Sequence, residues 1–289
     1  METRPEVTVI ITTYRRPALL VEAVESVLAQ TYRDFELIVA DDGSGDETAA
    51  RVAAFGDAVR YLALPHSGRP EEVRNQAIAA ARGRFLAFLD DDDLWHAEKL
   101  ARQVARLQQD RQIGYVYCDC RFLHQDGTLS PPVLPPQHKD EAATFENLLQ
   151  GCFVHPSTVL MRRTLFEKVG PFSDQFFSQG DYDLWLQAAW VAPVACVPEP
   201  LVYLRHYEDG LALQRDTLNY EYAILVLEAL RRRLPLTLRQ RWLSRRALSR
   251  WYVHLALRRE ATPAARHDLV RSLRLNPLQR AAWRALFHR

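Results

Sequence analysis

In the first 120 residues, short apolar runs alternate with stretches of helical periodicity. This is the pattern expected of buried strands separated by amphipathic helices. Short β-branched and apolar runs are typical of strands buried on both faces of a sheet. Apolar positions three and four residues apart predict the helices between them. The expected strands cover 7–11, 35–40, 59–64, 85–89 and 113–118, and the expected helices cover 17–30, 71–82 and 97–109. This alternation predicts an α/β fold with a mostly parallel sheet flanked by helices.

The pattern is less regular after residue 120. The elements expected there are a loop over 125–140, a helix over 181–191, two short strands over 194–205 and three or four amphipathic helices from about 211. We therefore divide the chain into an α/β domain over residues 1–210 and a helical C-terminal region over residues 211–289.

The net charge of +1 hides a strong asymmetry between these two regions. Residues 212–289 hold 17 arginines, no lysine and five carboxylates, a net charge of +12. The preceding residues carry 20 basic and 31 acidic side chains, a net charge of −11. The two regions therefore present different surfaces and are expected to do different work.

Cysteine spacing and hydropathy argue against a CxxC-based metal site, a secretory signal and a membrane span. The four cysteines, at positions 118, 120, 152 and 196, form no CxxC pair, so we expect reduced, buried thiols. The N-terminus is charged from the start, which is unlike a secretory signal. No apolar run reaches the ~18 residues of a membrane span. We expect a cytoplasmic protein, with contact at the inner face of the membrane left open.

Acidic side chains follow two of the predicted strands. Asp90 to Asp93 are four consecutive carboxylates that repel one another unless a cation or hydrogen bonds offset the charge. Asp90 and Asp92 point to the same side of an extended segment, as ligands of Mn²⁺ or Mg²⁺ would. The alternative is a solvated acidic turn. Ligands of open α/β sheets bind beyond the carboxyl ends of the strands, where these carboxylates lie.

Two further segments carry candidate chemistry. Asp42 and Gly43 end the second strand, where a carboxylate can accept from a ribose or base and glycine permits close approach. The alternative there is a turn, with Ser44 and Glu47 as a capping box for the next helix. Asp181 begins a later helix, where it can act as a general base toward a hydroxyl or simply cap the helix.

In their order and spacing, these segments resemble the family-2 glycosyltransferases, which have the GT-A fold, over roughly residues 6–210. The matching segments are Thr8–Tyr14, Ser26–Tyr32, Phe35–Val39, Asp41–Ser44, Val73–Ala77, Phe88–Trp95 and Gly180–Leu186. The resemblance implies donor nucleotide binding by Thr12, Tyr14, Asp42, Arg74 and Asp91, metal binding by Asp90, Asp92 and His206, and a catalytic base at Asp181. Gly180 stands where relatives often have glutamate.

The resemblance implies an inverting, metal-dependent transferase. With Mn²⁺ or Mg²⁺ as cofactor, it would move a sugar from a nucleotide-diphosphate sugar, a UDP- or TDP-sugar being favoured, to a glycan or lipid-linked hydroxyl. Polysaccharide or glycoconjugate synthesis at the cell surface is the implied pathway. The alternative is an inactive nucleotide-sugar-binding scaffold, which would not need Asp181.

The arginine-rich tail has several interpretations. Three interpretations remain open: a solvated structural appendage, peripheral contact with an anionic membrane, and homo-oligomerisation. Tryptophan and tyrosine lie among the arginines, as is typical of helices at a membrane interface. Nucleic-acid binding is disfavoured because no recognition motif accompanies the charge.

Overall fold

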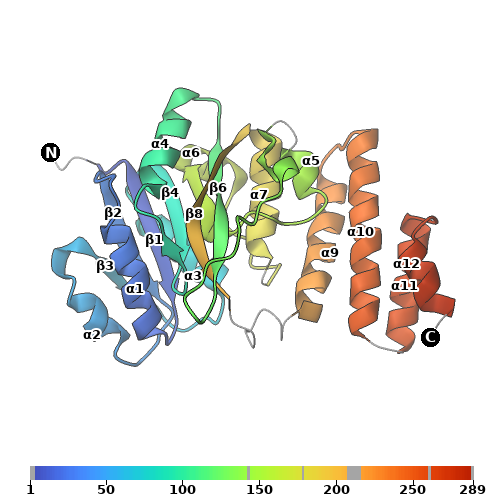
Figure 1. The fold of residues 1–289 in the computed structure, drawn as a ribbon, viewed down its shortest axis with the longest axis horizontal. Helices are drawn as coiled ribbons and strands as arrows, with labels where there is room; N and C mark the ends of the chain where they lie inside the picture. The colour runs from blue at the N-terminus through green and yellow to red at the C-terminus, as the bar shows by residue number, and fades with distance from the viewer. Residues whose placement is uncertain (1–3, 142–143, 178, 207–215, 260–261, 288–289) are drawn as a thin grey trace.

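The computed structural model describes residues 4–141, 144–177, 179–206, 216–259 and 262–287, and it confirms the α/β class (Figure 1). The strands are β1 (Val7–Thr13), β2 (Phe35–Asp41), β3 (Arg60–Ala63), β4 (Phe85–Asp90), β5 (Leu94–Trp95), β6 (Tyr115–Leu123), β7 (Val159–Arg162) and β8 (Val194–Arg205). The helices of the α/β part are α1 (Pro17–Leu28), α2 (Thr48–Ala53), α3 (Pro70–Ala80), α4 (Lys99–Gln109), α5 (Thr144–Leu148), α6 (Arg163–Val169) and α7 (Gly180–Val191). The C-terminal helices are α9 (Asp216–Arg233), α10 (Leu238–Arg258), α11 (Pro263–Leu275) and α12 (Arg280–Phe287).

The strands form one eight-stranded sheet in the order β3-β2-β1-β4-β7-β6-β8-β5. The strands β3, β2, β1 and β4 run parallel, and β7 is antiparallel to both of its neighbours. In the register, Thr13 pairs with Asp41 and Thr12 pairs with Asp90. The carboxyl ends of β2, β1 and β4 therefore meet at one edge, where their polar residues come together.

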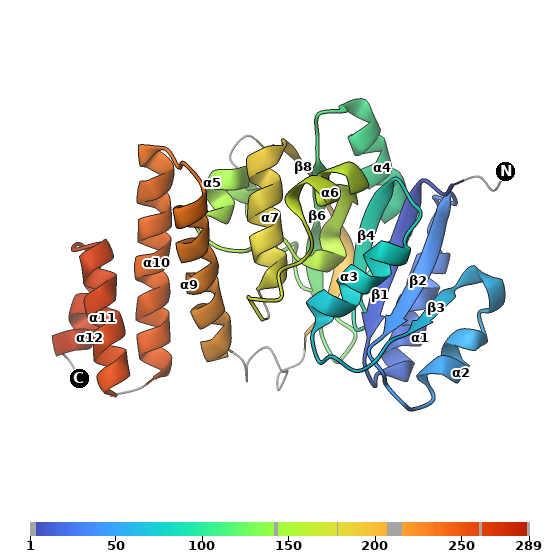
Figure 2. The same cartoon turned by 180° about the vertical axis from the view of Figure 1, so that it is seen from behind.

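Helices cover both faces of the sheet, as Figures 1 and 2 show from opposite sides. Alternate residues of β1 point to opposite faces. Val9 and Ile11 pack with α1, α2 and α4, whereas Ile10 belongs to a core that includes α3, α6 and α7. Burial on both faces explains why these strands are continuous apolar runs rather than alternating ones.

The C-terminal helices stand side by side beyond α7, ending with α11 and α12 at the far end of the molecule (Figure 1). Leu227 of α9 and Leu248 of α10 belong to the same core as Trp185 of α7. A separate small cluster that includes Leu269 joins α10, α11 and α12. The predicted boundary at residues 210 and 211 lies outside the described residues. Within the described ranges, none of the helices combines the length and the apolar character needed to cross a bilayer.

Two local predictions were wrong. The capping box does not form, because α2 begins at Thr48 and the Asp46 side chain accepts from the Thr48 N–H at 2.8 Å. The Ser44 hydroxyl instead bonds to the Asp41 carboxylate. The two short strands expected over 194–205 are one strand, β8, whose pairing with β6 shifts register near Pro198 to Pro200 because proline donates no hydrogen bond.

Candidate active site

A cavity of about 640 Å³ opens at the edge where β1, β2 and β4 end. Its walls come from the segment after β1, the loop before α3 and the acidic segment after β4. The lining residues are Thr12, Thr13, Tyr14, Arg15, Arg16, Asp42, His66, Gly68, Pro70, Val73, Arg74, Asp90, Asp91 and Asp92. Seven of the nine candidate residues predicted from the sequence line this cavity, and Asp181 and His206 lie outside its lining.

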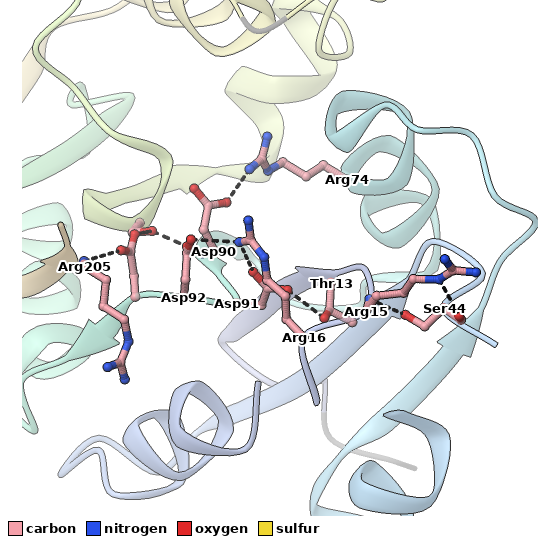
Figure 3. Close-up of polar contacts among 11 residues, drawn as sticks. Thr13, Arg15, Arg16, Ser44, Arg74, Asp90, Asp91, Asp92 and Arg205 are labelled. Carbon is pink, nitrogen blue, oxygen red and sulfur yellow. Dashed lines mark hydrogen bonds and ion pairs between the residues drawn. The ribbon is translucent and has the colours of Figure 1, made fainter. Parts of the chain in front are cut away.

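Arg16 compensates the charge of the acidic segment. Its Nη1 lies 3.1 Å from Asp91 Oδ1 and 2.8 Å from Asp92 Oδ2, and the Thr13 hydroxyl donates to Asp91 at 2.7 Å (Figure 3). Burial raises the pKa of Asp91 to about 6, although Arg16 and Thr13 act in the opposite direction. Burial and the charge of Asp90 also raise the pKa of Asp92. Burial makes the negative charge of these carboxylates costly, and a bound cation would offset that cost.

Asp90 points toward α3, where it forms an ion pair with the buried Arg74 (Figure 3). The Arg74 guanidinium also lies 5.8 Å from the centre of the Phe172 ring. Burial disfavours the charged guanidinium, but Asp90, Glu71 and Asp181 together hold the pKa of Arg74 above its ordinary value. Arg74 is thus a fixed positive charge at the cavity wall that interacts with three carboxylates.

Asp93 differs from the three carboxylates before it because it points away from the cavity. It accepts from the Ser157 hydroxyl at 2.6 Å and from the Arg205 N–H at 3.2 Å. It therefore links the acidic segment to the end of β8, which is a structural role.

Asp42 holds the loop that closes the cavity above α3. Its carboxylate accepts from the Ser67 N–H at 2.7 Å and the Gly68 N–H at 2.9 Å, and it lies 3.0 Å from the His66 ring. The His66 ring stacks on Tyr14 with centroids 4.3 Å apart and planes at 18°. Asp42 is only 6% exposed. Its contacts hold His66 in place against Tyr14, and the two rings form a flat surface at the cavity wall. No pattern in the sequence predicts that His66 stacks on Tyr14.

Asp181 lies in the first turn of α7, where its Oδ1 accepts from the Tyr182 N–H at 2.7 Å. Burial raises the pKa of Asp181 to about 7, and the charges of Glu71 and Asp90 add to this, whereas Arg74 acts in the opposite direction. A carboxylate that titrates near neutral pH is suited to accept and release a proton.

Gly180 sits in a crowded position beside the side chain of Glu71. A Cβ atom at Gly180 would lie 2.7 Å from Glu71 Cγ and 2.8 Å from the carbonyl oxygen of Ser173. Only glycine fits at position 180 without displacing these atoms. The carboxylate that neighbours Asp181 is that of Glu71 on α3, and not a side chain at position 180. Nothing in the sequence pattern indicates this role of Glu71, because it depends on how α3 packs against α7.

His206 follows β8 and is exposed, with its ring 5.5 Å from that of Phe122 and 5.8 Å from that of His124. Its N–H donates to the carbonyl oxygen of Leu123 at 3.0 Å. These contacts join His206 to the end of β6, and its metal-binding role stays a prediction.

The carboxylates after β4 have the chemistry of a hard-cation site. Asp90 and Asp92 offer oxygen ligands, and Arg16 supplies positive charge beside Asp92. In the described part of the chain, no group of three or more His, Cys, Asp and Glu side chains is arranged to hold a metal ion. A Mn²⁺ or Mg²⁺ ion at Asp90 and Asp92 would therefore take its other ligands from a bound phosphate group and water, as Mg²⁺ commonly does.

Comparison with known proteins agrees with this geometry. The family model described as Glycosyl transferase family 2 matches residues 8–170. The Escherichia coli UDP-Glc:alpha-D-GlcNAc-diphosphoundecaprenol beta-1,3-glucosyltransferase WfgD is 34% identical over 181 residues, which cover 62% of this chain and 68% of that protein. An uncharacterized glycosyltransferase of Rickettsia prowazekii is 31% identical over 204 residues, which cover 70% of this chain and 64% of that protein. The chain thus spans about two thirds of the length of these curated relatives.

Solved structures share the fold at lower identity. S. aureus TarS 1-349 in complex with UDP-GlcNAc has a TM-score of 0.70 at 18% identity, covering 93% of this chain and 81% of that one. The mannosyltransferase PcManGT from Pyrobaculum calidifontis, in complex with GDP-Man and Mn²⁺, has a TM-score of 0.61 at 19% identity, covering 100% and 89%. Because the family model matches more than half of the chain, and the sheet and its acidic edge agree with it, this chain belongs to glycosyl transferase family 2 and has a GT-A-type fold.

Proposed function

We propose that this glycosyltransferase is an inverting, metal-dependent enzyme that uses a UDP- or TDP-sugar and a hydroxyl acceptor. One observation carries the proposal. Asp90 at the end of β4 and the separate carboxylate of Asp181 both interact electrostatically with the buried Arg74. The cluster of carboxylates after β4 suits a metal site, whereas the single buried carboxylate of Asp181 suits a base. The names of two similar proteins support the donor class, since WfgD uses UDP-Glc and TarS was crystallised with UDP-GlcNAc.

The 640 Å³ cavity is the proposed donor site. The stacked rings of Tyr14 and His66 offer a flat surface for a nucleobase. Arg16 and Arg74 place positive charge where the diphosphate would lie, next to the acidic segment.

Asp90 and Asp92 are the proposed ligands of Mn²⁺ or Mg²⁺, with Asp92 as the direct ligand. When bound, the cation would neutralise the charge that develops on the departing nucleoside diphosphate. The Mn²⁺ in the PcManGT structure supports this choice of metal.

Asp181 is the proposed base. Its carboxylate takes the proton of the acceptor hydroxyl while that oxygen bonds to the anomeric carbon of the donor sugar. The bond from the anomeric carbon to the diphosphate oxygen breaks in the same step, and the nucleoside diphosphate leaves with the bonding electron pair. A single displacement from the opposite face inverts the configuration and needs no covalent enzyme intermediate.

Replacing Asp181 by Asn tests the proposal against the inactive-scaffold alternative. We expect the Asp181→Asn variant to lose transfer by 100-fold or more, on the order of a general-base contribution, while nucleotide binding is retained. Asp174→Asn is the matched control, because Asp174 is an exposed aspartate in the segment before α7. A scaffold would show no difference between the two variants in any assay of nucleotide release or product formation.

We also propose that the enzyme works on cell-surface polysaccharide or glycoconjugate, in the cytoplasm at the inner face of the membrane. The lipid-linked acceptor in the name of WfgD supports this. So does α10, which exposes Leu238 and Trp242 among its arginines, a combination typical of membrane-interface helices.

A further inference from the structure

Arg15 has a strained backbone at the wall of the 640 Å³ cavity. Its φ angle is 54°, and no other non-glycine residue in the described ranges has a positive φ. This left-handed conformation brings Cβ close to the following carbonyl oxygen, a cost that glycine would avoid. Strain of this kind persists only where the surrounding structure holds it, and such positions cluster at ligand sites.

Hydrogen bonds to Ser44 hold Arg15 in this conformation. The Arg15 N–H donates to Ser44 Oγ at 2.8 Å, and Arg15 Nε donates to the Ser44 carbonyl oxygen at 3.1 Å (Figure 3). Ser44 is itself buried, and its N–H donates to Asp41 Oδ1 at 3.0 Å. The loop after β2 therefore fixes both the backbone and the guanidinium group of Arg15.

Arg15 and Arg16 point to opposite sides of β1. Arg16 reaches the acidic segment after β4, whereas Arg15 reaches Ser44 after β2, and β1 lies between these two strands in the sheet. Figure 3 shows the two side chains diverging. A nucleotide whose diphosphate lies beside Arg16 would therefore extend its base toward Arg15.

Arg15 also lies beside the aromatic pair that is proposed to receive the base. Its Cζ atom is 5.2 Å from the centre of the Tyr14 ring, which stacks on His66. Arg15 is exposed, and within the described part of the chain its Nη1 and Nη2 atoms form no hydrogen bond. The exposed carboxylate of Asp46 interacts electrostatically with Arg15, but exposed ion pairs are weak. Both Nη groups can therefore donate to a ligand.

We propose that Arg15 selects the nucleobase of the donor by donating from its Nη groups to the O4 carbonyl oxygen of uracil or thymine. A guanidinium group only donates hydrogen bonds, and cytosine carries an amino group, itself a donor, in place of that oxygen. O4 lies across the pyrimidine ring from the ribose, so it points away from the diphosphate. The inference rests on the proposed function, because it requires the nucleotide to occupy this cavity.

Calorimetric titration of UDP and CDP in the presence of Mn²⁺ tests this role. The two nucleotides carry the same ribose and diphosphate, so the ratio of their dissociation constants reports on the base alone. The wild-type protein should bind UDP about tenfold more tightly than CDP, as one hydrogen bond from a charged donor provides. Arg15→Gly should weaken UDP binding by about tenfold and CDP binding by less than about twofold, so the preference disappears.

A control variant and a thermal melt separate base selection from charge and folding. Arg51→Gln removes an exposed arginine of α2 that does not line the cavity, so it changes the net charge equally and should leave both dissociation constants unchanged. Glycine relieves the left-handed backbone, so Arg15→Gly should melt at or above the wild-type temperature.

An unchanged ratio of the UDP and CDP dissociation constants in Arg15→Gly would overturn the inference. A lower melting temperature together with that unchanged ratio would assign Arg15 a structural role instead. Failure of the proposed function gives a different result, because the wild-type protein would then bind neither nucleotide, with or without Mn²⁺, and the inference would fall with it.

Discussion

Replacing Glu71 by Gln should move the acid limb of the pH–rate profile to lower pH. Glu71 is buried on α3, and its side chain packs against Gly180, the residue before the proposed base. Its negative charge adds to the burial that raises the pKa of Asp181 to about 7. Gln keeps the shape of the side chain and removes that charge, so the pKa of Asp181 should fall.

The size of the effect follows from the charge that is removed. A like charge a few ångströms away, in the effective dielectric of a protein, shifts a pKa by on the order of one unit. The ionised carboxylate is the active form of the base. At pH 6 its fraction would rise from about a tenth to about a half, so kcat/KM should rise about fivefold. Above pH 8 Asp181 is ionised in both proteins, and their rates should agree within about twofold.

The assay is nucleotide release at saturating metal across pH 5 to 9, with Glu72→Gln as the control. Glu72 is the next residue of α3 and is exposed, and the largest influences on the pKa of Asp181 do not include it. An acid limb that stays in place or moves to higher pH in Glu71→Gln would refute the reasoning. Equal shifts in the two variants would show that the net charge of α3, and not the contact at Gly180, is responsible.

Three further outcomes are expected. Asp92→Asn should lose the metal-dependent part of nucleotide binding, measured as the change in melting temperature with Mn²⁺, and an unchanged metal effect would contradict the assignment. Gly180→Ala should lower the free energy of unfolding by about 1–3 kcal/mol in urea titrations, because the new Cβ meets Ser173 and Glu71 at under 3 Å. Unchanged stability would show that the surrounding atoms can move to make room for the methyl group. Asp119→Ala should cost about 2–4 kcal/mol, since the buried carboxylate accepts from three backbone N–H groups; a thermal melt that is unchanged would count against this.

The sheet and its acidic edge were predictable because both depend on local sequence. Apolar runs of the right length become strands, and the polar residues that end them, such as Asp42 and Asp90, are carried to one edge by parallel pairing. The strand β7 was not predicted, because it lies outside the strand–helix alternation of the first 120 residues and its antiparallel pairing with β4 depends on how the whole sheet assembles.

The rest of the site depends on approaches between distant segments. Arg16, His66 and Glu71 carry no pattern that separates them from surface residues, yet packing brings them to Asp92, Tyr14 and Asp181 respectively. The departure at Gly180 was visible in the sequence, but its cause was not, since only the structure shows Glu71 filling that space.

The arginine-rich tail shows the same limit. Its charge is evident from composition, but the side chain that reaches the α/β domain is not. Arg250 meets Gln150 because α9 and α10 pack onto the core that contains α7.

The central claim is most directly tested by a thermal-shift panel of UDP, TDP, GDP and CDP with and without Mn²⁺. A ligand that binds only the folded protein raises its melting temperature, by roughly 5 °C at a hundred times the dissociation constant for a chain of this size. We predict a metal-dependent rise with UDP or TDP. No rise with any of the four nucleotides, with or without the metal, would contradict the donor site on which the proposed reaction depends.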